Sequence, residues 1–392
     1  MNTPPSTAQQ STTSPLEGIR VIELAGIGPG PHVGQVLADM GAEVVRVTRP
    51  GGPLAGAGDP PMIPDRGKKS VVLNLREAGA REVLLDMVRD ADVLLEANRP
   101  GVAERLGVGP EACHAVNPRL VYGRMTGWGQ TGPWAERAGH DINYISITGA
   151  LHALGEVGRP PPPPLNFVGD YGGGSLFCVA GILAALLRAE RTGLGDVVDA
   201  AIVDGAHSLM GIVHALAALR QWSPERQSNL IDGAAPFYRC YGCADGGFIA
   251  VGCIEPQFFA EMLDLLEIDP EGFGRQTDVK VWPAQHARLE ALFATRDRDH
   301  WAELFEGSDA CVTPVLTYRE AADHPHNAAR GALTREGSFT HPAPAPRFGS
   351  GEVRLDPSIA APGSHTREVL EGLGYSEARI AELVAAGVVA AA

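Results

Sequence analysis

The first third of the chain alternates between short apolar runs and amphipathic stretches, and this pattern constrains the fold more than any other feature. The apolar run 19–24 ends in a glycine-rich turn, Gly26 to Pro31, which an amphipathic stretch and the apolar run 43–47 follow. The same order recurs in further apolar runs at residues 71–75, 91–97 and 120–125. Strands that alternate with helices predict a parallel sheet with crossover helices. We therefore expect an α/β fold whose main part is a Rossmann-like, doubly wound domain.

The length of 392 residues exceeds the size at which one hydrophobic core usually stops growing, so a second domain is expected. Residues 222–234 are polar and make a natural boundary. Beyond it, a hairpin pattern with Asp245-Gly246-Gly247 at its turn and three helical patterns predict a smaller α+β domain. The expected division is a disordered tail at 1–14, a large domain at 15–221 and 335–392, a small domain at 235–330, and linkers at 222–234 and 331–334.

Charge and cysteine content exclude several classes of protein. The formal net charge of −15 argues against a nucleic-acid or anionic-membrane partner. No apolar run approaches the roughly 20 residues of a membrane helix, and the polar N-terminus lacks the form of a signal peptide. The six cysteines are scattered, which favours reduced thiols in the cytoplasm. Cys240 and Cys243 form a CxxC without a second pair at zinc-ligand spacing, so no metal site is expected.

Basic residues gather in the N-terminal third of this acidic chain, several of them near the expected carboxyl ends of strands. They are Arg46, Arg49, Arg66, Lys68, Lys69, Arg99 and Arg105. Guanidinium groups at such positions suit a phosphorylated ligand, although each one alone is also compatible with a solvated surface charge. An NADP site is the alternative, with Arg49 on the 2′-phosphate. The prolines at 29 and 31 crowd the glycine-rich turn, which favours a tight strand-to-helix connection over a dinucleotide cradle.

Two proton-carrying groups mark the candidate site. His140 and Asp141 lie in a glycine-flanked loop, and Asp170 follows thirty positions after the histidine, just before Gly172 to Gly174 and an apolar helix-like run. Acid–base groups on turns of a rigid scaffold suit catalysis. By residue pattern alone, Asp170 could equally cap the helix that follows, and His140 could be structural.

Several motifs together give the chain a family resemblance. PLEGIRVIEL, LADMGAEVVRV, RPGVAERLG, RMTGWGQTGP, AGHDINYI, NFVGDYGGGS and APGSHTREVLEGLGY stand in the order found in the family of class III CoA-transferases and α-methylacyl-CoA racemases. The resemblance covers about residues 16 to 388 and is strongest to the racemases of that family. It implies an interlocked homodimer whose active site lies between the large domain of one chain and the small domain of the other.

The resemblance also assigns roles to particular residues. It places His140 and Asp170 at the two catalytic positions, with Asp141 and Glu255 as supporting carboxylates. It places Arg49, Arg99 and Arg105 at positions that contact coenzyme A, which is part of the substrate, so no separate cofactor is expected.

The implied reaction interconverts (R)- and (S)-2-methylacyl-CoA thioesters by 1,1-proton transfer through an enolate. This reaction needs two acid–base groups, one on each face of the α-carbon, and His140 and Asp170 satisfy that need. A carboxylate such as Glu255 would orient the imidazole, and amides after Asp170 could donate to the enolate oxygen.

Two other functions stay open for these residues. In a class III CoA-transferase, Asp170 would be a nucleophile instead of an acid–base group. In an acyl-CoA-binding protein, none of these residues would react. The presence of both His140 and Glu255 favours the racemase, because racemisation needs a base at the histidine position.

Overall fold

The computed structural model describes residues 14–52, 59–349 and 355–391, so nearly all of the expected tail lies outside the described residues. The chain divides into two compact units. Unit 1 consists of Met1–Thr148, Pro164–Leu209 and Gly331–Ala392, and unit 2 consists of Gly149–Pro163 and Met210–Arg330. The chain therefore leaves unit 1 twice and returns to it each time.

Unit 1 is built on a seven-stranded sheet with the strand order β12-β3-β2-β1-β4-β5-β6. Neighbouring strands pair in parallel except β12 and β3, which are antiparallel. The strands are β1 (Arg20–Leu24), β2 (Glu43–Thr48), β3 (Lys69–Leu73), β4 (Val93–Glu96), β5 (Val121–Thr126), β6 (Asp196–Ala201) and β12 (Val389–Ala390). This sheet confirms the α/β fold predicted from the alternating pattern.

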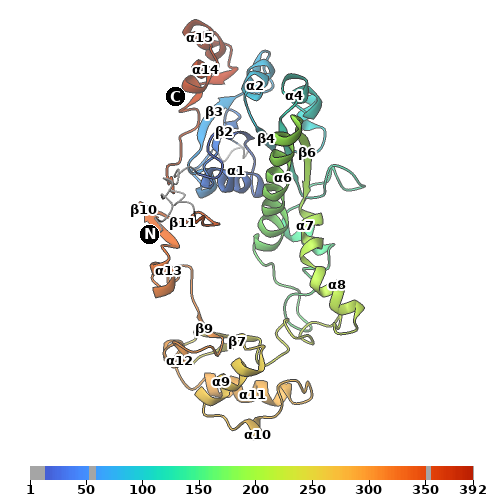
Figure 1. The fold of residues 1–392 in the computed structure, drawn as a ribbon, viewed down its shortest axis with the longest axis vertical. Helices are drawn as coiled ribbons and strands as arrows, with labels where there is room; N and C mark the ends of the chain where they lie inside the picture. The colour runs from blue at the N-terminus through green and yellow to red at the C-terminus, as the bar shows by residue number, and fades with distance from the viewer. Residues whose placement is uncertain (1–13, 53–58, 350–354, 392) are drawn as a thin grey trace, which may run out of the picture. The chain divides into compact units, whose positions relative to one another are not determined.

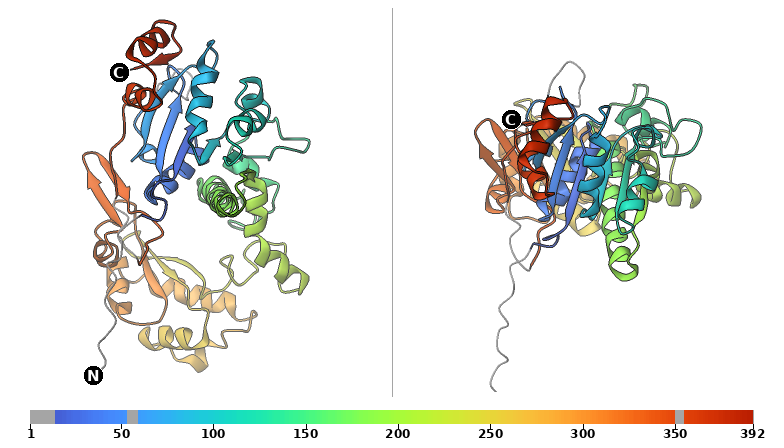
Figure 2. Two further views of the ribbon diagram at one scale, coloured as in Figure 1. Left: turned by 45° about the horizontal axis from the view of Figure 1, so that its top comes forward. Right: turned by 90° about the horizontal axis from the view of Figure 1, so that it is seen from above.

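Successive strand residues point to opposite faces of the sheet. Both faces of this sheet carry apolar side chains, and helices cover both of them. Val21, Val44 and Val93 pack on the face that carries α1 (Pro29–Asp39) and α6 (Leu176–Thr192). Ile22, Val45 and Leu94 pack on the opposite face. The helices on that second face are α2 (Ala80–Arg89), α4 (Pro110–Val116), α14 (Thr366–Gly372) and α15 (Glu377–Ala385). Figure 1 shows α1 and α6 beside the strands, and Figure 2 shows the C-terminal helices next to the blue strands.

Charged side chains are also buried in unit 1, and they pair with one another. Lys68 Nζ lies 2.7 Å from Glu23 Oε2, and both side chains are almost fully buried. Arg66 forms a similar pair with Asp39, at 2.5 Å between Nη2 and Oδ2. Arg46 contacts Asp59 at 2.6 Å and is equally enclosed. Three of the basic residues singled out in the sequence therefore neutralise buried carboxylates inside the fold.

The remaining elements of unit 1 connect or extend the sheet. A π-helical segment, η2, runs straight into α6, so that Phe167–Thr192 forms one continuous helix. The other elements are η1 (Ile63–Asp65), α3 (Val102–Arg105), α5 (Asp141–Ser146), η2 (Phe167–Ser175), α7 (Ile202–Leu209), β10 (Leu333–Glu336) and β11 (Phe339–Pro342).

The continuous helix corrects the expectation that no apolar run approaches membrane-spanning length. Its length and composition would allow it to cross a membrane, and it is the one such helix in the described part of the chain. It packs against β5, β6 and α1 along the sheet, and 44% of its most apolar 18-residue stretch is buried. These contacts are those of a core helix.

Unit 2 has its own small antiparallel sheet and hydrophobic core. The sheet order is β7-β8-β9, and aromatic residues such as Phe259, Phe293 and Trp301 fill the core. Its elements are α8 (Gly211–Ala218), β7 (Arg239–Gly242), β8 (Phe248–Val251), α9 (Pro256–Leu265), α10 (Pro270–Phe273), α11 (Trp282–Phe293), α12 (Arg298–Phe305), β9 (Val312–Val315) and α13 (Pro325–Ala329). The expected hairpin corresponds to β7 and β8.

Candidate active site

A cavity of about 370 Å³ in unit 1, called the acid–base pocket below, brings three predicted site residues together. His140, Asp170 and Arg99 all line it. They come from three different places in the chain: the residue before α5, segment η2, and the loop after β4. The glycine-rich turn after β1 contributes Ile27 to Pro29 to the same wall. That turn therefore forms part of a pocket next to a catalytic candidate.

His140 immediately precedes α5 and has extended backbone. Asn143, one turn into the helix, accepts the His140 backbone N–H through Oδ1 at 3.1 Å and returns its own N–H to the His140 carbonyl at 2.7 Å. These reciprocal bonds fix the start of the helix. They hold the backbone that carries the imidazole at the wall of the pocket.

Asp170 lies in the first turn of η2 and is half-buried. The pKa of its carboxyl is raised to about 6, chiefly by burial and then by the nearby Asp141 carboxylate, while His140 acts in the opposite direction. Gly28 approaches this carboxyl closely, because a Cβ at Gly28 would lie 3.3 Å from Asp170 Oδ2. With this pKa, about a tenth of the Asp170 carboxyls hold a proton at pH 7, so the group is suited to both accept and donate one.

Asp141 supports the segment that carries Asp170. Its carboxylate accepts the Asp170 backbone N–H at 2.6 Å. Burial raises the pKa of Asp141, and the amides of Asp170 and Gly169 oppose that rise by bonding to the ionised form. The sequence predicted Asp141 as a supporting carboxylate next to His140. The structure shows that the group it supports directly is the backbone at Asp170.

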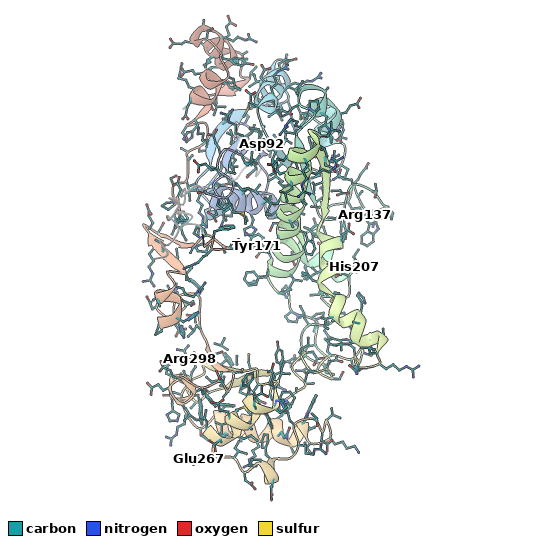
Figure 3. The ribbon with its side chains drawn as sticks, in the orientation of Figure 1. Asp92, Arg137, Tyr171, His207, Glu267 and Arg298 are labelled. Atoms are coloured by element: carbon teal, nitrogen blue, oxygen red, sulfur yellow. The ribbon has the colours of Figure 1, made fainter. Side chains whose placement is uncertain are left out.

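His32 of α1 makes two contacts with η2, a ring stack and a hydrogen bond. The ring of His32 stacks on Tyr171, with 4.1 Å between centroids, and its Nδ1 lies 2.6 Å from Ser175 Oγ. Ser175 in turn donates to the Tyr171 carbonyl at 3.1 Å. Figure 3 labels Tyr171 in this segment. The residue after Asp170 is therefore anchored to the first helix of the sheet.

The amides that follow Asp170 are not free to hold an enolate oxygen, contrary to the expectation from sequence. The helix begins at Phe167 and not at the glycines. The Asp170 amide is bound by Asp141, and the Tyr171 amide donates to the Asn166 carbonyl at 3.1 Å. Gly172 to Gly174 lie inside η2, where a Cβ on Gly173 would lie 2.8 Å from the Ala206 backbone nitrogen. These glycines serve the close packing of η2 on α7.

The other two predicted coenzyme A arginines line a second, larger cavity. It measures about 1070 Å³ and lies at the carboxyl ends of β1, β2 and β3, with Arg49 and Arg105 in its wall. Ile27, Ala97 and Asn98 line both cavities, so the two adjoin. Ligands of open α/β sheets bind at the carboxyl ends of the strands. Together the two cavities offer a phosphate-binding region next to an acid–base pair.

Several residues that line these cavities were not predicted as site residues. Arg76 belongs to the large cavity, and Trp128 and Tyr144 belong to the acid–base pocket. Trp128 lies in the loop after β5, within the quoted motif RMTGWGQTGP, and its ring meets Tyr144 edge-on at 4.8 Å. Tyr144 lies in the quoted motif AGHDINYI, so the two motifs were the signal that could have found Trp128 and Tyr144. No pattern in the sequence pointed to Arg76.

Glu255, the fourth predicted catalytic residue, belongs to unit 2, where it immediately precedes α9. Its place beside His140 stays a prediction. The CxxC of the same unit has one exposed and one buried cysteine, and no cluster able to hold a metal occurs among the residues that the structure describes.

A mostly parallel sheet with His140, Asp170 and arginine-lined cavities at its carboxyl edge places the chain in the class of α/β proteins with a ligand site at the ends of the strands. The sequence model described as CoA-transferase family III matches residues 16–366. The chain belongs to the CoA-transferase family III.

The relatives agree with this membership over nearly the whole chain. Alpha-methylacyl-CoA racemase of Mus musculus is 43% identical over 94% of this chain and 96% of its own length. The Homo sapiens protein of the same name is 42% identical, with the same two coverages. A crystal structure of a CAIB/BAIF family protein from Brucella suis superimposes with a TM-score of 0.79 and 29% identity, covering 92% of this chain and 99% of the other.

Proposed function

We propose that this enzyme is a racemase that interconverts (R)- and (S)-2-methylacyl-CoA thioesters through an enolate. The observation that carries the proposal is the acid–base pocket, where His140 and Asp170 line one cavity and burial raises the pKa of Asp170 to about 6. Racemisation needs two groups that each exchange a proton near neutral pH, on opposite faces of one carbon. The high identity to two α-methylacyl-CoA racemases supports the same activity.

In the proposed reaction, one of the two groups removes the α-proton and the other delivers a proton to the opposite face. When His140 removes the proton, Asp170 begins protonated, and its raised pKa makes that form accessible. When Asp170 removes the proton, it begins ionised, and the imidazolium of His140 delivers the proton. Each turnover leaves the pair in the protonation state that serves the reverse direction. Before a second turnover in the same direction, His140 must release the proton it removed and Asp170 must regain one, and solvent is the route that makes the α-proton exchange in heavy water.

Coenzyme A would occupy the two adjoining cavities. Its phosphates would be held by the guanidinium groups of Arg49 and Arg105 in the large cavity, and Arg99 would contact it next to the acid–base pair. The coenzyme is part of the substrate, so the proposal includes no separate cofactor.

We further propose that two copies form an interlocked dimer in the cytoplasm, with Glu255 of one copy beside His140 of the other. The apolar surface of the described chain supports pairing. α8 has no buried residue, and Phe177, Ile212 and Leu219 expose 40%, 57% and 66% of their surface. Exposed apolar side chains of this size can mark an interaction surface on each unit.

The experiment that tests the racemase is proton exchange. The enzyme is incubated in heavy water with one enantiomer of a 2-methylacyl-CoA and no acceptor acid, and the α-proton is followed by NMR. We expect loss of the α-proton signal together with the appearance of the other epimer. His140→Ala and Asp170→Ala should each abolish epimerisation, whereas Arg89→Gln, a change in an exposed pair on α2, should not.

The second candidate is a CoA-transferase, which the name of the family favours. In that reaction, the Asp170 carboxylate attacks the thioester carbonyl and forms a mixed anhydride, which releases the thiolate of coenzyme A. Coenzyme A transfer to an added free acid without any α-proton exchange would establish this reaction and overturn the racemase.

A further inference from the structure

We propose that Arg137 binds a carboxylate at the far end of the acyl chain, so that the substrates are 2-methylacyl-CoA thioesters of dicarboxylic acids. This inference rests on the proposed racemase function and names its substrate class. It starts from the acid–base pocket, whose wall includes Arg137 as well as Arg99. Figure 3 labels Arg137 in the loop that joins β5 and α5.

Arg137 is exposed, and its guanidinium lies over an aromatic ring. Its guanidinium carbon lies 4.8 Å from the centroid of the Trp134 ring, and its backbone N–H donates to the Trp134 carbonyl at 2.8 Å. Trp134 meets Trp128 edge-on at 5.0 Å, and Trp128 meets Tyr144 at 4.8 Å. The Tyr144 hydroxyl donates to the Gly139 carbonyl, which closes the loop on itself. A stacked guanidinium keeps its N–H edge available, and this edge matches a carboxylate.

Arg137 forms no ion pair with the described residues of its own chain. Among residues 14–52, 59–349 and 355–391, no carboxylate forms an ion pair with it, and its side chain makes no hydrogen bond. Among the described residues, Asp170 is the only carboxylate in the pocket wall, and it has a catalytic task in the proposed reaction. The chain carries a formal net charge of −15, so an anionic acyl chain is repelled unless a local cation receives it. Arg137 provides that cation.

The position of Arg137 also limits the length of the acyl chain. It stands three residues before His140, so their Cα atoms are at most about 11 Å apart. Coenzyme A enters from the large cavity, which adjoins the acid–base pocket through Ile27, Ala97 and Asn98. Arg137 does not line that large cavity. Its expected ligand is therefore the acyl end of the substrate, with a carboxylate a few carbons from the reacting α-carbon.

The test compares two substrates of equal length, 2-methyladipyl-CoA and its ω-methyl ester, in the heavy-water exchange assay. We expect the wild-type enzyme to prefer the free acid in kcat/KM, and Arg137→Gln to lower that preference about 3- to 5-fold, as befits loss of a charge-assisted pair that solvent screens. Arg137→Lys, which keeps the charge without the planar fork, should retain part of the preference. Arg89→Gln, a matched charge change on the surface, should retain all of it.

Three results separate the possible failures. If Arg137→Gln leaves the preference unchanged while the ester is still epimerised, the assignment of Arg137 is overturned and the racemase stands. If Arg137→Gln weakens inhibition by acetyl-CoA as much as binding of the free acid, Arg137 holds a phosphate of coenzyme A, and the proposal is likewise overturned. If neither substrate exchanges its proton, the racemase fails, and the ratio of the two dissociation constants by titration calorimetry then decides for or against Arg137.

Discussion

Replacing Asp170 by asparagine should stabilise the fold at neutral pH while it abolishes catalysis. The carboxyl titrates near 3.8 in the unfolded chain and near 6 in the folded chain. Below pH 3.8 both states are protonated, and ionisation costs the fold nothing. As the pH rises from 4 to 6, the unfolded chain releases its proton first, so the wild-type protein loses stability. Above pH 6 the folded state carries the whole cost of the half-buried charge, which asparagine lacks.

The size of this effect follows from the shift in pKa. A shift of about two units corresponds to about 3 kcal/mol for a fully buried group. Asp170 is half-exposed, and screening by solvent reduces this to about 1–2 kcal/mol. For a unit of this size the gain amounts to roughly 2–5 °C in the melting temperature.

The assay is differential scanning calorimetry of the wild type and Asp170→Asn between pH 4 and pH 8. We expect the two melting temperatures of unit 1 to converge near pH 4 and to separate above pH 6, with the variant higher. The exposed Asp90→Asn serves as the control and should show no comparable dependence on pH. A variant that melts below the wild type at pH 7.5, or a difference that is the same at every pH, would refute the account of the Asp170 pKa.

Three further substitutions test the pocket, the large cavity and the core. Gly139→Ala should lower kcat at least 10-fold, because its Cβ would lie 2.6 Å from the Tyr144 ring and displace the loop that ends at His140; steady-state epimerisation measures it. Arg105→Gln should weaken binding of acetyl-CoA about 10-fold and make that binding less sensitive to salt, as titration calorimetry would show. Lys68→Met should destabilise unit 1 by about 3–5 kcal/mol in urea unfolding, because it leaves Glu23 buried without its partner.

Each of these has a control. Gly372→Ala adds a methyl group to a residue with open space around it and should leave kcat unchanged. Arg89→Gln should leave acetyl-CoA binding and its salt dependence unchanged. The double variant Glu23→Gln with Lys68→Met removes both charges and should recover part of the lost stability. Full activity of Gly139→Ala, unchanged acetyl-CoA binding by Arg105→Gln, or wild-type stability of Lys68→Met would each contradict the corresponding structural argument.

The sequence by itself determined the sheet of unit 1, because the alternation of apolar and amphipathic stretches is a local signal. β1, β2, β3 and β4 coincide closely with the apolar runs, and the loop residues His140 and Asp170 stand out by their glycine-rich surroundings. The motifs around these two residues also identified the family. These features depend on residues close together in the chain, which is why they could be predicted.

Only the tertiary structure decided which charges are available to a ligand. Arg66 looked like a ligand-binding residue, but it is buried against Asp39 and donates to the carbonyl of Pro342, far along the chain. Arg137, which sequence reasoning passed over, lines the acid–base pocket. The structure also shows that Asp141 accepts the Asp170 backbone N–H, a contact that its position beside His140 in the sequence did not predict. Ion pairs, burial and pKa shifts depend on partners distant in sequence, and composition and spacing carry no record of which partner each charge will meet.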